Sequence, residues 1–271
     1  MQKKFYQFLC LIISSLITLS SCVTSSSQGN FSKQEVIIEN SLPKSKLAYY
    51  SDSFDTLRDD IWENEAITFR EEQISHIKLA EMNIEKGKLK IKTKTGGISK
   101  NGLSSKYTLK GDFDIQIDCQ IDFLESANDI SQQLYFVVHP KKFTSEKDKE
   151  ACHVIIILRK MPGENSRIFS RYANPDEKVL FRKVRRSGDF QGTLRIVRIG
   201  NMFSILYKKD GQLEWTDFHN FRGIEDEVRV AFALQNFNGL RTIYFPAKSS
   251  ISATFDNFQI NAAQEIIEDE I

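Results

Sequence analysis

The sequence predicts an all-β protein, on the basis of two alternating regions and the lack of long helical patterns. From Phe113 to Phe123 every odd position is apolar, and every even position from Asp112 to Asp122 is polar. A period of two over this length is typical of a β-strand with one buried and one hydrated face. In residues 193–215 the pair Gly200-Asn201 separates two apolar runs, as in a hairpin. No helical pattern of three turns occurs in the folded part, so we expect an antiparallel β-sandwich.

The first 21 residues are interpreted as a bacterial lipoprotein signal peptide. A basic start precedes the apolar run Phe5–Leu19, which is shorter than the roughly 20 residues that a membrane-spanning helix needs. The run ends in Leu19-Ser20-Ser21-Cys22, which resembles a lipobox, so Cys22 is the expected lipid-attachment site. The alternative is an ordinary signal peptide with an incidental cysteine. We expect an exported chain that is anchored to the bacterial cell envelope. The outer membrane is favoured because Val23, and not Asp, follows the cysteine.

The remaining chain divides into a tether, one domain and a tail. Residues 22–48 are predicted to hold the lipidated cysteine and a flexible, serine-rich tether. The sandwich is expected at residues 49–262, and residues 263–271 are expected to form an acidic tail. Without Lys3 and Lys4, which leave with the signal peptide, 35 basic residues face 36 acidic ones. This near-neutral balance predicts no nucleic-acid partner.

Short runs along the domain are typical of further strands. Lys88–Lys94 alternates apolar residues with lysines, which suits a strand near a sheet edge. β-Branched residues are concentrated in Leu134–Val138 and Val154–Leu158, which we expect to be buried strands. The last strands are predicted at Val228–Leu234 and Ala253–Ile260.

Loose motifs recur in a defined order along the domain: Phe54-Asp55 with Trp62, Gly87-x-Leu89-x-Ile91, Leu109-x-Gly111-Asp112-Phe113-Asp114, Leu194-x-Ile196-x-Arg198 with Asp210-Gly211 and Trp215, and Phe255-Asp256-Asn257-Phe258. This order resembles concanavalin A-like lectin/glucanase domains, in particular the uncharacterised bacterial exported branch of that superfamily. The resemblance spans about residues 50–262. It implies a jelly-roll sandwich with a concave face that often binds glycans, and it does not imply catalysis.

The acids of the long strand are the one pattern that suggests glycan hydrolysis. Residues i and i+2 of a strand lie about 6.6 Å apart on one face, which is compatible with the carboxyl pair of a retaining glycosidase. The stretch Asp114–Asp118 is superficially similar to the catalytic register of the glucanase branch. However, Gln116 occupies its middle position and cannot exchange a proton. Since acids on a solvated strand face are ordinary, no catalytic residue is assigned.

Neither a metal site nor a cofactor is predicted. The four histidines form no i, i+2 or i, i+4 pair, and no Cys/His zinc spacing or phosphate-binding loop occurs. A basic stretch runs from Arg167 to Arg198 with nine Lys or Arg residues and three acids. It is either the solvated face of edge strands or a patch for acidic glycans or lipid headgroups.

Four residues on or beside apolar strands are candidates for glycan binding: Gln133, Tyr135, Gln235 and Asn236. Amides and a phenol both donate to and accept from sugar hydroxyls. Exposure at a sheet edge would explain the same residues, so both interpretations stay open.

Cys119 and Cys152 are the cysteines that remain once the signal peptide is removed and Cys22 is lipidated. Both occupy apolar positions of their strands, and export would place them in an oxidising compartment. A disulfide between them and two separate buried thiols are both compatible with the sequence.

Three functional hypotheses follow. The first is a lipid-anchored envelope protein that binds a glycan or has a structural role without catalysis. The second is a glycoside hydrolase or lyase with a divergent active site. The third is an adhesin or assembly subunit that binds a protein partner.

Overall fold

A computed structural model describes residues 36–64, 77–124, 130–140, 153–174, 179–224, 227–238 and 247–269. In these segments the chain forms fifteen strands and one short helix, α1 (Lys44–Tyr50). The predicted antiparallel β-sandwich is confirmed. Cys22 and Cys152 lie outside the described residues.

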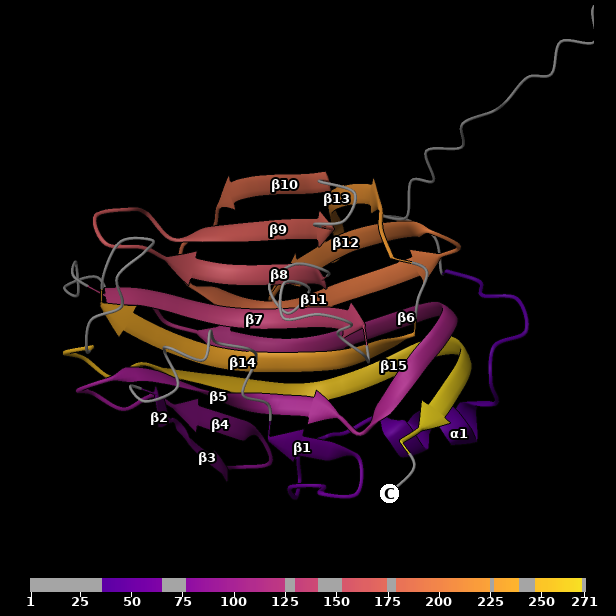
Figure 1. The fold of residues 1–271 in the computed structure, drawn as a ribbon, viewed down its shortest axis with the longest axis horizontal. Helices are drawn as coiled ribbons and strands as arrows, with labels where there is room; N and C mark the ends of the chain where they lie inside the picture. The colour runs from indigo at the N-terminus through magenta and orange to yellow at the C-terminus, as the bar shows by residue number, and fades with distance from the viewer. Residues whose placement is uncertain are drawn as a thin grey trace, which may run out of the picture.

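The strands form two layers, which we call layer A and layer B (Figure 1). Layer A has the order β10 (Val179–Arg186), β9 (Arg167–Asn174), β8 (His153–Lys160), β7 (Ile130–Pro140), β14 (Val228–Asn238) and β5 (Ile98–Ser105). Two short strands, β1 (Trp62–Asn64) and β2 (Ile77–Leu79), pair with β5.

Layer B has the order β13 (Thr216–Arg222), β12 (Met202–Lys209), β11 (Phe190–Ile199), β6 (Tyr107–Ile121), β15 (Ser252–Glu268), β4 (Leu89–Lys92) and β3 (Glu81–Ile84). Between β14 of layer A and β6 of layer B, a single residue pair, Val228 with Leu109, joins the ladders. The chain passes from β5 in layer A to β6 in layer B at Lys106.

The long alternating stretch behaves as predicted. Strand β6 directs its apolar residues into the space between the layers, and none of Phe113, Ile115, Ile117 and Ile121 is exposed. Aromatic contacts close the core across this space. The ring centroids of Phe232 in β14 and Phe255 in β15 lie 4.9 Å apart. The core is therefore the shared interior of the two layers.

The hairpin at Gly200-Asn201 is also confirmed, since β11 ends at Ile199 and β12 begins at Met202. Gly200 has φ +56°, a left-handed conformation that suits a glycine in a tight turn. The two strands then pair without a shift from Ile199 back to Gly192.

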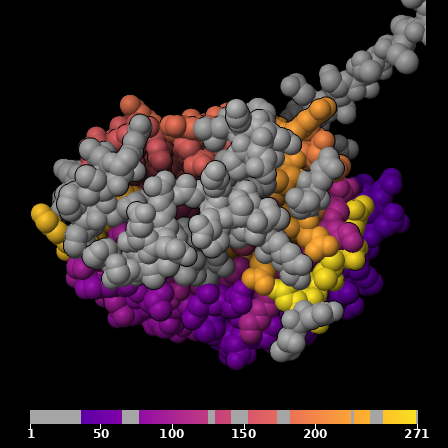
Figure 2. Space-filling model, in the orientation of Figure 1, coloured from indigo at the N-terminus to yellow at the C-terminus, as the bar shows by residue number. Residues whose placement is uncertain are grey.

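Figure 2 shows the N-terminal part of the described chain, in indigo, beside the last strand, in yellow, and both predicted boundaries of the domain need correction. Residues 263–268 are not a free tail, because β15 continues to Glu268 and pairs there with β6. Ala263 and Ile266 are both buried there, on either side of a register shift, a pattern that a search for simple alternation does not find. At the other end, the Leu42 N–H donates to the Ala263 carbonyl at 2.8 Å, and Leu47 of α1 is buried. The folded body therefore begins before residue 49.

Candidate functional site

The outer face of layer A carries a continuous row of polar side chains, which we call the polar row. Residues directly opposite in neighbouring strands point to the same face of a sheet. Register therefore aligns one residue from each of six strands, in the order Lys100, Gln235, Gln133, Arg159, Arg167 and Arg186. From Gln235 to Arg186 the row crosses four strand spacings, or about 19 Å.

Three of the four glycan-binding candidates meet in one cluster at this row. The Tyr135 hydroxyl lies 2.5 Å from Gln235 Oε1 and also within hydrogen-bond distance of Gln133 Oε1. A phenol has one proton, so at any moment it donates to one of these two carbonyl oxygens. Gln133 and Gln235 are 7% and 5% exposed, whereas Tyr135 is half-buried. The two amides therefore orient the phenol.

The fourth candidate, Asn236, does not belong to this cluster, and that prediction is wrong. Asn236 follows Gln235 in the same strand, so its side chain points to the opposite face, into the sandwich. There its Nδ2 donates to the Ser249 carbonyl at 2.6 Å. It was chosen as an amide beside an apolar strand, and strand alternation places that amide on the opposite face from Gln235.

An apolar cluster lies beside the polar row on the same outer face. It consists of Val137, Ile155, Ile157, Phe169 and Ala231, with Tyr135 packed against it. It is separate from the core between the layers. Layer A therefore has buried apolar residues on both of its faces, beside the polar row on the outer one. This explains the unbroken β-branched run of β8.

Two arginines lie against the ring of Phe169 at the edge of this cluster. The Arg159 guanidinium lies 4.7 Å and the Arg182 guanidinium 5.0 Å from the ring centroid. Burial lowers the pKa of Arg159 from its ordinary value, the Glu164 carboxylate opposes this, and the positive charges of Arg182 and Arg167 add to the lowering. Of these two arginines, the sequence analysis missed Arg159 and included Arg182 in the basic stretch. Arg159 lies outside the basic stretch, and that stretch itself mixes residues from both layers.

The outer face of layer B holds the acids that the sequence suggested for hydrolysis, and their oxygens are engaged. Arg195 Nε donates to Asp114 Oδ1 at 2.7 Å, and its Nη2 donates to Oδ2. Asp114 is 1% exposed. Asp118 accepts from Thr193 Oγ1 at 2.5 Å and from Asn257 Nδ2 at 3.1 Å. Neighbouring strands thus satisfy both carboxylates.

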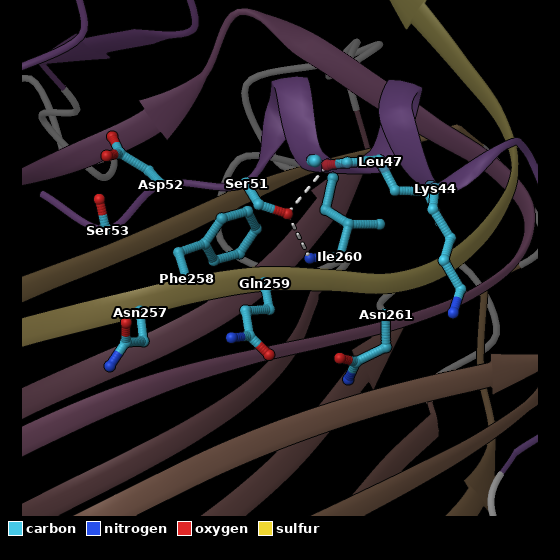
Figure 3. Close-up of a pocket in the computed structure, with 11 residues that line it drawn as sticks. Lys44, Leu47, Ser51, Asp52, Ser53, Asn257, Phe258, Gln259, Ile260 and Asn261 are labelled. Atoms are coloured by element: carbon cyan, nitrogen blue, oxygen red, sulfur yellow. Dashed lines mark hydrogen bonds between the residues drawn. The ribbon is translucent and has the colours of Figure 1, made fainter.

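An open pocket of about 480 Å³ lies beside these acids, between α1 and β15 (Figure 3). The amides of Asn257, Gln259 and Asn261 extend from β15 along its rim. Each is bonded to β6: besides the Asn257 bond, Gln116 Nε2 donates to Gln259 Oε1 at 3.1 Å, and Asn261 Nδ2 donates to Asp114 Oδ1 at 3.2 Å. This surface is a cross-strand network whose polar groups already have partners.

Cys119 lies in the core, where burial raises the pKa of its thiol well above the ordinary value. Its predicted partner Cys152 lies outside the described residues, so the disulfide stays a prediction. Within the described segments, no three His, Cys, Asp or Glu residues are grouped as metal ligands would be. No helix in these segments is long and apolar enough to cross a membrane.

Solved structures resemble this arrangement closely enough to give the fold a name. A glycoside hydrolase family protein from Mycobacterium thermorestibile aligns with a TM-score of 0.56 and 10% identity, over 78% of this chain and 98% of that chain. LamA from Zobellia galactanivorans, in complex with laminaritriose and laminaritetraose, aligns with a TM-score of 0.55 and 9% identity, over 83% and 99%. The chain has a concanavalin A-like jelly-roll fold.

The same concanavalin A-like fold aligns with the Emp46p carbohydrate recognition domain, with a TM-score of 0.50 and 11% identity, over 85% of this chain and 97% of that chain. No protein-family model and no curated protein matches the sequence. At identities near 10%, similarity of structure establishes the fold alone.

Proposed function

We propose that this chain is a non-catalytic glycan-binding module of the bacterial cell envelope, exported and held to the membrane through a lipidated Cys22. The observation that supports binding is the cluster of Tyr135, Gln133 and Gln235 on the outer face of layer A. Its phenol and amides match the donor and acceptor character of sugar hydroxyls. Solved structures of the same fold include a carbohydrate recognition domain and a complex with laminarin oligosaccharides.

The chemistry of the same face favours binding over hydrolysis. The six strands β5, β7, β8, β9, β10 and β14 contain no Asp or Glu. Hydrolysis of a glycosidic bond ordinarily uses a pair of carboxyl groups, one of which donates a proton. The strands supply amides, a phenol and guanidiniums instead, which hold a glycan by hydrogen bonds and charge.

A glycan array probed with the purified full chain in mild detergent tests the proposal. Tyr135→Phe removes the phenol with little change of volume, and we expect it to weaken binding to any hit about fivefold. The matched control is Gln259→Leu on layer B, which is expected to leave binding unchanged. Binding to no glycan, or equal losses in both variants, would contradict the proposal.

A hydrolysis assay on each hit separates the module from the alternative of a divergent glycoside hydrolase or lyase. We expect no turnover. Turnover that Asp114→Asn or Asp118→Asn abolishes would establish the enzyme, with layer B as its active face. If the chain instead captures an envelope protein and no glycan, the third hypothesis of an adhesin or assembly subunit gains support.

The anchor requires its own test, because Cys22 lies outside the described residues. Cells fed an alkyne fatty acid are expected to label the wild-type chain and not Cys22→Ser. If the variant still incorporates label and stays in the membrane fraction, the assignment of Cys22 is wrong.

A further inference from the structure

Charge is segregated between the layers more sharply than the net charge of the chain suggests. The six strands of layer A that contain no acid carry ten basic residues: Lys100, Arg159, Lys160, Arg167, Arg171, Arg182, Lys183, Arg185, Arg186 and Arg229. In contrast, the seven strands of layer B are balanced, because β6 and β15 each carry three acids while β11 and β12 each carry two basic residues and no acid. The near-neutral total thus conceals one strongly basic layer.

Register places several of these cations directly opposite one another. Arg167 of β9 lies opposite Arg159 of β8 on one side and opposite Arg186 of β10 on the other. Arg171 and Arg182 form a further opposed pair. Like charges in directly opposed positions destabilise a sheet. Arg167 Nη1 forms an ion pair with Glu164 Oε2 at 3.4 Å, which offsets part of this repulsion.

Protection of a sheet edge explains only part of this pattern. Strand β10 is the outer strand of layer A, and basic residues on such a strand discourage edge-to-edge association. Arg159 and Arg167 belong to β8 and β9, which have a strand on both sides. Repulsion between Arg159 and Arg167 does not protect a sheet edge. Because it costs stability in the free protein, we take it as a sign of a role in binding.

The position of Arg159 suits a bound anion. Its guanidinium is held over the Phe169 ring, and its buried Nε has no hydrogen-bond partner among the described residues. A planar guanidinium that is already oriented loses little freedom when it binds sulfate or carboxylate through two parallel hydrogen bonds. Arg159 and Arg167 are both half-buried, and Arg186 at the end of the row is exposed.

We propose that the arginine end of the polar row selects anionic glycans, whose sulfate or carboxylate groups pair with Arg159, Arg167 and Arg186. The inference rests on the proposed function, because the amide and phenol cluster contributes the sugar contacts. The polar row contains both the amide and phenol cluster and the arginines, because Gln133 lies directly opposite Arg159. Phe169, the aromatic residue among these arginines, lies beneath two guanidiniums and presents no open ring for a nucleic acid base to stack on.

Dextran and dextran sulfate test the charge preference, since they share one backbone. We expect the full chain to bind dextran sulfate at least about tenfold more tightly, and to lose that advantage as ionic strength rises from about 0.05 to about 0.5 M. The double variant Arg159→Gln, Arg167→Gln is expected to weaken dextran sulfate binding about tenfold. Arg186→Gln, at an exposed position, gives a smaller loss in the same direction.

The charge-matched control is the double variant Lys110→Gln, Arg222→Gln, at two exposed positions of layer B. It removes the same net charge and is expected to bind dextran sulfate as the wild type does. Polygalacturonate forms a second arm. Binding of dextran sulfate, of polygalacturonate or of both supports the proposal and identifies whether sulfate or carboxylate is recognised.

Several outcomes would overturn the inference. Equal binding of dextran and dextran sulfate, or equal losses in the two double variants, would show that the row does not select charge. Duplex DNA or phosphatidylglycerol vesicles that bind as tightly as dextran sulfate would indicate a general polyanion surface. Neutral glycans that bind without charge preference would leave the proposed function intact, whereas no binding to any glycan would remove both.

Discussion

The outer faces of the two layers differ in how their charged side chains are arranged: opposite charges are paired on layer B, and like charges are adjacent on layer A. On layer B, Asp114 and Arg195 form a buried bidentate pair, and Asp118 accepts from the two strands that flank β6. On layer A, Arg159, Arg167 and Arg186 lie opposite one another. The first face pairs opposite charges across neighbouring strands, whereas the second places like charges next to one another, with the Glu164 carboxylate beside Arg167. Polarity alone therefore does not identify a binding surface, because satisfied and unsatisfied polar groups have different consequences.

The largest effect that separates the faces is expected at Asp114. Substitution Asp114→Ala leaves the 8%-exposed Arg195 without its carboxylate, and breaking a buried ion pair costs about 3–5 kcal/mol. Urea unfolding measures this loss. Glu164→Ala, which breaks the half-exposed pair with Arg167, is the control and is expected to cost less than about 1 kcal/mol. Equal losses would contradict the contrast between the faces.

A fall in pH is expected to destabilise the basic layer. Burial, assisted by the positive charge of Arg171 and by His139, lowers the pKa of His153 in β8 to about 3, from an ordinary value of 6.5. The unfolded chain therefore binds the proton first, so this contribution is complete above pH 6.5 and is lost as pH falls toward 3. We expect a loss of about 2 kcal/mol by about pH 4.5.

His219 adds to the same acid sensitivity from between the layers. Its Nδ1 lies 2.8 Å from Ser170 Oγ, and burial with the nearby charge of Lys183 lowers the pKa of His219 to about 4. Urea unfolding at several pH values measures the sum. His153→Gln is expected to flatten the pH dependence, and an unchanged slope in that variant would assign the sensitivity to other groups.

The smallest expected effect is a gain in stability at the arginine end of layer A. Arg186→Gln removes one member of an opposed like-charge pair on the outermost strand, so the free energy of unfolding should stay constant or rise by up to about 1 kcal/mol. Thermal unfolding at low ionic strength measures it, because salt screens the repulsion. A clear destabilisation would mean that Arg186 has a structural partner.

The candidate site was partly accessible from the sequence. Gln133 and Tyr135 are two residues apart in one strand, so their shared face follows from strand alternation. Asn236 failed for the same reason, since it is one residue from Gln235. The pairing of Gln133 with Gln235 and with Arg159 depends on which strands become neighbours. Residues so far apart in the sequence give no local signal of that pairing. The basic stretch was visible, but its members divide between two layers.

The sequence by itself determined the local structure and the content of the core. Alternation in β6, the Gly200-Asn201 turn and the β-branched runs each follow from backbone preferences and burial within a few residues. Only the tertiary structure decided which polar residues have partners, because opposing strands come from distant parts of the chain. In the sequence, the residues of the Asp114–Arg195 pair and of the Arg159–Arg167 pair are all charged positions on strands, and nothing local shows which of them will meet. Register made the first pair a buried structural contact, and it placed the two like charges of the second pair side by side on the outer face of layer A.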